Sequence, residues 1–234
     1  MTERGKNDVD RTADEFVIGP STVAWRGGAM ELEIREVTFP IVSSLVGRVR
    51  LEPEIVQTRR FELDEAGRHI WSPVAPRARV EVELTKPSVA WRGSAYLDTN
   101  WGSEPLESAF VDWSWSRCGI GGDAVLHYDV QPRRGPARGI ATRFDASGAS
   151  EDIVAPDFRP LPTSAWGVKR NVRSQGDAEL VRTLENAPFY NRNVVRTELF
   201  GTEVVGVHES LSLDRFAHPI VKLMLPFRMP RRAR

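Results

Sequence analysis

Cysteine is almost absent from this sequence, since the chain of 234 residues has Cys118 alone and only four histidines. One cysteine cannot form an internal disulfide, and no CxxC or HxxxH spacing supplies the ligands of a zinc site. We therefore expect no metal, no cofactor and a reducing, cytoplasmic environment.

An excess of charge of one sign is also lacking, because Lys and Arg together number 32, and so do Asp and Glu. This balance gives no reason to expect nucleic acid as a partner. No run of about 18 apolar residues and no basic-then-apolar amino terminus occurs, so the sequence predicts neither a transmembrane helix nor a secretory signal. The closing segment PFRMPRRAR (226–234) is basic and partly apolar, which fits either a solvated tail or peripheral contact with an anionic inner membrane.

Apolar residues are scarce in residues 1–15, MTERGKNDVDRTADE, so this segment cannot bury enough surface to offset its ordering entropy. We expect it to be a disordered leader. Beyond it lie short runs of alternating apolar and polar residues, separated by turn residues, and 18 glycines and 16 prolines punctuate the chain too often for a helical bundle.

One of these runs, ARVEVELT, shows the strand pattern clearly. Val80 and Val82 point to one side of an extended chain, and Glu81 and Glu83 point to the other, which is typical of a strand with one solvated face. About ten such runs predict an all-β protein, a barrel or a sandwich, with one short helix near residues 105–113.

A five-residue repeat, VAWRG, occurs at Val23–Gly27 and again at Val89–Gly93. Identity of this length that includes a tryptophan indicates duplication of a β unit. We expect Trp25 and Trp91 to pack in the core. The predicted organisation is a partial amino-terminal β unit at residues 16–60 and a β-barrel domain at residues 61–234.

The differences between the copies include two polar replacements, where Met30 and Leu32 of the first copy correspond to Tyr96 and Asp98 of the second. Residues two apart in a strand share a face, so Tyr96 and Asp98 project together, and His69 and Trp71 do the same upstream. These four side chains are the candidate site. A glycine-rich stretch, GIGGD at 119–123, lacks the lysine and the following helix of a phosphate-binding loop.

Three stretches, HIWSPVAPRARVEVEL, WRGSAYLDTNWGSEPLESAFVDWSWSR and ESLSLDRFAHPIVKLMLPFRMPR, resemble the carotenoid 1,2-hydratase (hydroxyneurosporene synthase) family. The resemblance implies a lipocalin-like architecture, and the chain is similar to the carboxyl-terminal part of those longer proteins. It also implies a truncated, cofactor-independent hydro-lyase that adds water to the 1,2 double bond of lycopene or neurosporene. The HxW and YxD pairs that this family is thought to use match His69, Trp71, Tyr96 and Asp98.

Hydration of an alkene requires an acid, groups that stabilise a cation and a group that accepts a proton, and the four candidate residues are of these types. Hydration of an alkene begins with protonation, which gives a tertiary carbocation, so the site needs an acid, and Asp98 qualifies if burial raises its pKa. The π faces of Trp71 and Tyr96 stabilise the cation, and His69 accepts a proton from water or orients it, although the roles of His69 and Asp98 are interchangeable at this stage.

Structural roles compete with these assignments. Asp98 fits an Asx-type turn, and a histidine on a strand is more often structural, as we expect for His127, His208 and His218. Trp113 and Trp115 belong to the core or line an apolar tunnel. Two other functions stay open, a non-catalytic carrier of hydrophobic ligands and a cofactor-free cyclase on the same scaffold, because fold alone does not separate them.

Overall fold

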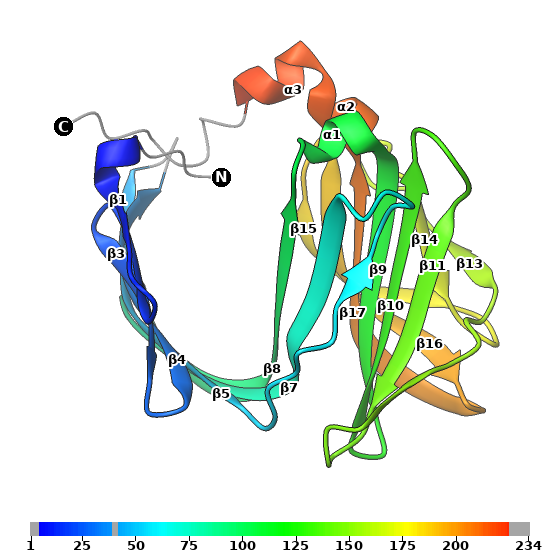
Figure 1. The fold of residues 1–234 in the computed structure, drawn as a ribbon, viewed down its shortest axis with the longest axis horizontal. Coiled ribbons are helices and arrows are strands. Elements are labelled where there is room, and N and C mark those ends of the chain that lie inside the picture. Colours follow the sequence, from blue (N-terminus) through cyan, green and yellow to red (C-terminus); the bar gives the residue numbers. More distant parts are fainter. Residues whose placement is uncertain (1–4, 39–41, 225–234) are drawn as a thin grey trace. The chain divides into compact units, whose positions relative to one another are not determined.

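The structure is a computed structural model that describes residues 5–38 and 42–224 (Figure 1). The segment 226–234, which the sequence assigns to a tail or a membrane contact, lies outside the described residues. Short turns connect the successive strands. The strands are β1 (Val9–Arg11), β2 (Glu15–Ile18), β3 (Ser21–Arg26), β4 (Ala29–Thr38), β5 (Ser43–Pro53), β6 (Phe61–Glu62), β7 (His69–Lys86), β8 (Ser88–Gly102), β9 (Phe110–Ile120), β10 (Asp123–Pro132), β11 (Arg138–Phe144), β12 (Ser150–Asp152), β13 (Phe158–Leu161), β14 (Arg170–Arg173), β15 (Glu179–Asn186), β16 (Tyr190–Leu199) and β17 (Thr202–Ser212).

The chain forms two compact units, and it passes between them more than once. Unit 1 comprises residues 1–56, 77–97 and 222–234, and unit 2 comprises residues 57–76 and 98–221. Strands β7 and β8 therefore contribute residues to both units. The sequence analysis places one boundary at residue 60, whereas the contacts add crossings within two long strands, after Pro76 in β7 and after Leu97 in β8.

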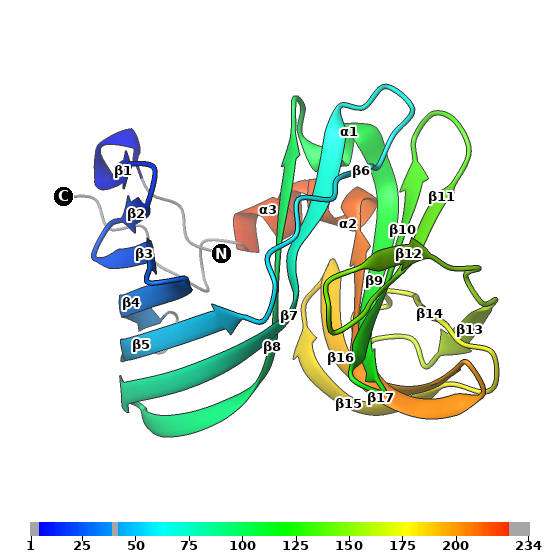
Figure 2. The same ribbon diagram turned by 60° about the horizontal axis from the view of Figure 1, so that its bottom comes forward.

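Unit 1 is built on an antiparallel sheet in the order β1-β2-β3-β4-β5-β7, with β8 pairing β7. Figure 2 shows β4, β5, β7 and β8 side by side. The alternation in ARVEVELT is reproduced, since Val82 is buried opposite Val49 while Glu83 is exposed and pairs with Arg48 at 3.0 Å. Strand β1 lies within the expected leader, and its three residues are exposed, so backbone pairing orders it without burial.

The two copies of VAWRG differ in backbone conformation. In the first, Gly27 and Gly28 both have positive φ angles, 56° and 79°, and form the turn between β3 and β4. In the second, Ser94 follows Gly93, and because serine does not favour that conformation, β8 continues without a turn. The prediction that both tryptophans are core residues is wrong, since Trp25 is 37% exposed and Trp91 is 50% exposed. Each lies on a sheet of unit 1 where few side chains are fully buried.

Unit 2 contains a seven-stranded antiparallel sheet in the order β12-β11-β10-β9-β17-β16-β15. Every residue of β10 from Ala124 to Tyr128 is buried, which a sheet with one solvated face does not allow. One face of β10 carries Tyr128, which packs on Trp71 of β7. The other face lies toward the β13–β14 hairpin, which Figures 1 and 2 show to one side of the sheet.

Polar side chains fill the space between that second face and the hairpin. Asp129 of β10 forms a partly buried ion pair with Arg173 of β14 at 2.6 Å. His208 donates from Nε2 to the backbone carbonyl of Asn171 at 2.9 Å, and His127 lies 3.3 Å from the hydroxyl of Ser116. Burial lowers the pKa of both histidines to about 4, so each is neutral at pH 7. The two histidines therefore occupy structural positions.

Helices are short in the described residues. The helix predicted near residues 105–113 is the single turn α1 (Leu106–Ala109), and it ends where the alternating residues of β9 begin. The sequence analysis did not predict two short helices, α2 (Leu213–Ala217) and α3 (Pro219–Met224). Ser212 caps α2, because its side chain accepts a hydrogen bond from the amide of Arg215, and a serine at this position is typical of a helix start. Within residues 5–38 and 42–224, no helix has the length and apolar content to cross a bilayer.

Candidate active site

Trp71 and Asp98, predicted from separate motifs, are hydrogen-bonded in unit 2. The indole Nε1 of Trp71 donates to Oδ2 of Asp98 at 2.9 Å. Trp71 has no exposed surface, and Asp98 is half-buried. A buried indole N–H needs an acceptor, and the carboxyl of Asp98 supplies it. One oxygen of the carboxyl is thereby held as an acceptor.

His69 lies two residues before Trp71, and both of its ring nitrogens are bonded. Nδ1 lies 2.7 Å from Oδ2 of Asp64, and Nε2 lies 3.1 Å from the backbone carbonyl of Glu104. Each ring nitrogen therefore faces an oxygen that accepts hydrogen bonds. The ring is 2% exposed. With both nitrogens engaged, His69 holds two loops together.

Asp64 is the carboxylate partner of His69. Burial raises the pKa of Asp64, but hydrogen bonds from His69 and from the amides of Arg68 and Ala66 outweigh it, so the pKa is lowered overall. Gly102 allows this arrangement, because a Cβ there would come within 2.4 Å of Cδ2 of His69. The sequence reading missed Asp64, although LDEAG before the HxW motif resembles an Asx turn.

Tyr96 belongs to unit 1 and is half-buried. It lies two residues before Asp98 in β8, so the two side chains leave the same face of that strand. The predicted pairing of Tyr96 and Asp98 along one strand therefore matches the secondary structure.

A row of aromatic rings extends from Trp71 through unit 2. We call it the aromatic row, and successive ring centroids are separated by 5.1 Å from Phe61 to Trp71, 5.0 Å from Trp71 to Tyr128, 5.8 Å from Tyr128 to Trp113 and 6.4 Å from Trp113 to Tyr190. Trp113 was expected in the core or in a tunnel wall, and it lies half-buried within this row. The sequence analysis did not predict Tyr128 and Tyr190, because the rings of the row come together from five different strands.

Glu209 is a second carboxylate beside the aromatic row. Its Oε1 accepts a hydrogen bond from Nε of Arg192 at 2.7 Å, and its carboxylate is bonded to the hydroxyl of Tyr190. Burial and then the charge of Glu209 raise the pKa of Tyr190. Burial, followed by the charges of Asp98 and Glu209, raises the pKa of Tyr128. Both phenols therefore keep their protons at neutral pH.

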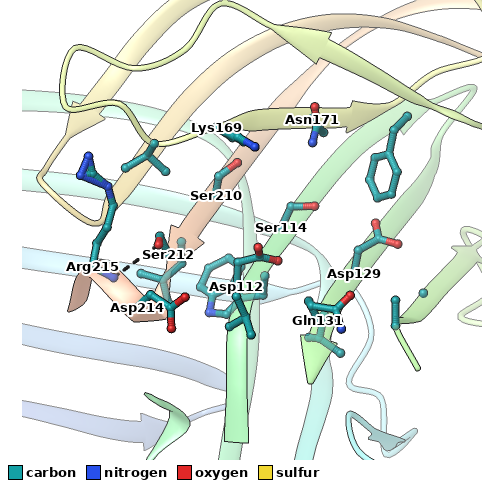
Figure 3. A pocket seen from close by; sticks show the side chains of 18 of the residues that line it. Asp112, Ser114, Asp129, Gln131, Lys169, Asn171, Ser210, Ser212, Asp214 and Arg215 are labelled. Atoms are coloured by element: carbon teal, nitrogen blue, oxygen red, sulfur yellow. Dashed lines mark hydrogen bonds between the residues drawn. The ribbon is translucent and has the colours of Figure 1, made fainter. Parts of the chain in front are cut away.

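A polar pocket of about 580 Å³ lies on the other face of the sheet (Figure 3). Its lining includes Asp112, Asp129 and Lys169, with hydroxyls of Ser114 and Ser210 between them. Partial burial and the charge of Asp214 raise the pKa of Asp112, while the ammonium of Lys169 opposes that shift. Trp113 of the aromatic row also lines this pocket, together with Phe158 and Leu211. The lining is therefore mixed, with charged groups beside apolar side chains.

Among the residues that the structure describes, no three His, Cys, Asp or Glu side chains lie close enough together to hold a metal ion. Cys118 is a buried free thiol with its pKa raised by burial. The side chains near Trp71 in the described structure carry carboxyl, phenol, indole and imidazole groups.

The full chain, residues 1–234, matches the family model described as "Carotenoid hydratase CrtC". It is 47% identical over 234 residues to the acyclic carotenoid 1,2-hydratase of Thiocapsa roseopersicina, which covers 99% of this chain and 58% of that protein. It is 36% identical over 235 residues to the protein of the same name from Cereibacter sphaeroides, covering 99% of this chain and 84% of that protein. The chain thus spans 58% of the length of the Thiocapsa protein and corresponds to the carboxyl-terminal part of its relatives.

Among solved structures, a putative AttH protein from Nitrosomonas europaea is similar with a TM-score of 0.59 and 14% identity, covering 88% of this chain and 72% of the other. At this identity the likeness shows the fold alone. The predicted class, an all-β and lipocalin-like protein, is confirmed by this similarity and by the antiparallel sheets.

Proposed function

Because the chain belongs to the carotenoid hydratase (CrtC) family, we propose that it adds water across the terminal 1,2 double bond of an acyclic carotenoid. The observation that carries the proposal is the hydrogen bond from Trp71, a member of the aromatic row, to Asp98. It combines the two things that alkene hydration needs, an acid and a wall of π faces.

Asp98 is the acid in this proposal. When its carboxyl is protonated, Oδ2 accepts from the indole of Trp71, so the proton resides on Oδ1, and one orientation of the acid is selected. Transfer of that proton to the less substituted alkene carbon, C2, leaves a tertiary cation at C1. A water molecule then forms the new C–O bond at C1 and returns a proton to the Asp98 carboxylate, so the acid is regenerated.

The aromatic groups stabilise the cation. A desolvated π face contributes about 0.5–2 kcal/mol to a nearby positive charge. Trp71 provides one such face in this proposal, while the role of Tyr96 stays a prediction from its two-residue spacing to Asp98 in β8. The wall also excludes water other than the one that reacts, because a tertiary cation is captured by any nucleophile that reaches it.

His69 acts as a positioning residue and not as the base. Its ring nitrogens are bonded to Asp64 and to the carbonyl of Glu104, which fixes the start of β7 two residues before Trp71. Of the two roles that the motif allows for His69, proton acceptor and orienting group, the bonding pattern supports the second.

Contact with a membrane surface fits a substrate that dissolves in lipid, and we include it in the proposal. Helix α3 exposes 62% of Ile220 and 68% of Leu223, and Lys222 lies between them. Apolar side chains beside a cation are typical of segments that lie on an anionic bilayer.

The test is incubation of the purified chain with lycopene or neurosporene in detergent, beside Asp98→Asn. Asp112→Asn, which removes a carboxyl from the polar pocket, is the matched control. We expect a product heavier by one water from the wild type and from Asp112→Asn, and none from Asp98→Asn. A wild type that binds carotenoid without turnover would instead identify a carrier, and a rearranged product of unchanged mass would identify a cyclase.

A further inference from the structure

Arg170 of β14 carries a buried positive charge, and within the part of the chain that the structure describes no carboxylate pairs with it. The residue is 5% exposed, and its Nη1 donates to two neutral oxygens, Oδ1 of Asn193 at 2.8 Å and Oγ1 of Thr183 at 3.2 Å. Arginine stays charged in proteins, and a buried ion without a counter-charge loses its hydration uncompensated. Buried charges are therefore almost always paired.

Two buried donors of one hydrogen-bond network lack an acceptor among the described residues, Nε of Arg170 and Nδ2 of Asn191. Asn193 links the two side chains, because its Oδ1 accepts from Arg170 and its Nδ2 donates to Oδ1 of Asn191 at 2.6 Å. A guanidinium only donates, so it fixes the orientation of both amides and leaves an N–H of Asn191 at the end of the network. We call these three side chains the Arg170 network. It has one positive charge and two donors to satisfy.

We propose that the Arg170 network binds one small inorganic anion of the size of chloride, held by Nε of Arg170 and Nδ2 of Asn191. The anion accepts from both donors and supplies the counter-charge. Water would accept from the donors as well, but it would leave the charge of Arg170 unbalanced. Asn191 and Asn193 have no exposed surface, so the site is enclosed and suits only a small ion.

The position of the network gives the anion a structural role. Arg170 belongs to β14 and Asn191 to β16, so an ion between them fastens the β13–β14 hairpin to the seven-stranded sheet. Asn171, the neighbour of Arg170, lines the polar pocket, and its carbonyl is bonded to His208, which lies opposite Asn193 in the strand register. The pocket is the side from which the ion approaches in this proposal. The inference is independent of the proposed hydration, because the ion binds without carotenoid.

The experiment measures the urea midpoint of the purified chain in sodium chloride and in sodium gluconate at equal ionic strength. An ion that binds only the folded state raises the midpoint as its concentration increases. We expect a rise of about 1 M urea when chloride reaches about 100 times its dissociation constant. Gluconate is too large for the enclosed site and should give no such rise. Equal midpoints in the two salts at every concentration would overturn the proposal.

Three variants connect the chloride response to the network. Arg170→Met removes the charge and should abolish the response. Asn191→Asp keeps the oxygen that accepts from Asn193 and replaces the unpartnered N–H with a carboxylate oxygen, so the chain supplies its own counter-charge. We expect this variant to have a higher midpoint than wild type in gluconate and no response to chloride. Arg173→Met is the matched control, because Arg173 already pairs with Asp129 at 2.6 Å, and it should keep the response at a lower stability.

Crystals grown in bromide locate the ion by anomalous scattering, and we expect a peak in contact with Nε of Arg170. Density for water there without an anomalous peak overturns the proposal. A chloride response that persists in Arg170→Met, or in a destabilised Asn191→Asp, also overturns it. A bromide peak without any chloride response in solution marks an adventitious ion only and overturns the structural role. If Arg170→Met does not fold, Asn191→Asp and the bromide map decide the question.

Discussion

His69 and Asp64 form a buried pair in which Nδ1 and Oδ2 lie 2.7 Å apart, five residues from each other along the chain. Removing one partner leaves the other buried without its counter-charge, which typically costs about 3–5 kcal/mol. We expect His69→Gln and Asp64→Asn each to lower the free energy of unfolding by several kcal/mol. In urea denaturation the double variant should lose much less than the sum of the two. Additive losses would show that the pair does not act as a unit.

Trp71→Phe keeps the ring but removes the N–H that holds Oδ2 of Asp98. Without this donor the proton of the acid is no longer confined to one oxygen, so we expect the hydration rate at saturating carotenoid to fall about 10-fold, the equivalent of about 1.4 kcal/mol. Trp113→Phe is the control, because its ring belongs to the same aromatic row and contacts Tyr128 at a centroid distance of 5.8 Å. Equal hydration rates for Trp71→Phe and Trp113→Phe would contradict the proposal that Trp71 orients the carboxyl of Asp98.

Gly102→Ala tests the close approach of β8 to His69. The added Cβ would lie 2.4 Å from Cδ2 of His69 and 3.1 Å from the backbone carbonyl of Arg68, so the imidazole must move. We expect a loss of about 1–3 kcal/mol in the free energy of unfolding, as for other overpacked sites. Gly119→Ala, whose nearest neighbour would be 3.9 Å away, should change it by less than about 0.5 kcal/mol. Similar losses of unfolding free energy in Gly102→Ala and Gly119→Ala would contradict the close packing of Gly102 against His69.

Acidification should destabilise the chain before its carboxylates titrate. His127 and His208 have folded pKa values of about 4, below the value of about 6.5 in an unfolded chain, so the unfolded state binds more protons as the pH falls below 6.5. Each histidine should remove up to about 1.4 kcal/mol of unfolding free energy per pH unit between pH 6 and pH 5. Urea titrations at these pH values measure the slope. In the His208→Asn variant, about one proton fewer should be taken up on unfolding, so the slope of the unfolding free energy against pH should be smaller. His218 is exposed, and His218→Gln should leave this slope unchanged.

Binding to vesicles tests the membrane contact. Replacing Ile220 and Leu223 of α3 with serine removes two exposed apolar side chains, and we expect the fraction bound to anionic phospholipid vesicles to fall several-fold in flotation assays. Val205→Ser is the control, since Val205 is also exposed but lies on β17. Binding that is insensitive to the α3 changes would assign the contact to another part of the chain or exclude it.

The local sequence pattern was sufficient to predict many of the strands and the strand positions of the candidate site residues. Alternation predicted strands such as the one containing Val80 and Val82, and the two-residue spacing predicted Tyr96 with Asp98. It did not predict Tyr128 or Glu209, because their positions in or beside the aromatic row depend on which strands pair and in which register. Duplication of VAWRG likewise suggested equal structures, whereas one residue after the second copy, Ser94, prevents the turn.

The turn at Gly121 and Gly122 has a consequence for chemistry that is remote from it. Both glycines have positive φ angles, and they join β9 to β10 so that Ile120 pairs with Asp123. A slip of one residue at this hairpin would reverse every side chain of β10, sending Asp129 into the aromatic row and Tyr128 into the polar pocket. The Gly121–Gly122 turn, which has no side-chain chemistry of its own, thus determines which side chains of β10 face the aromatic row and which face the polar pocket.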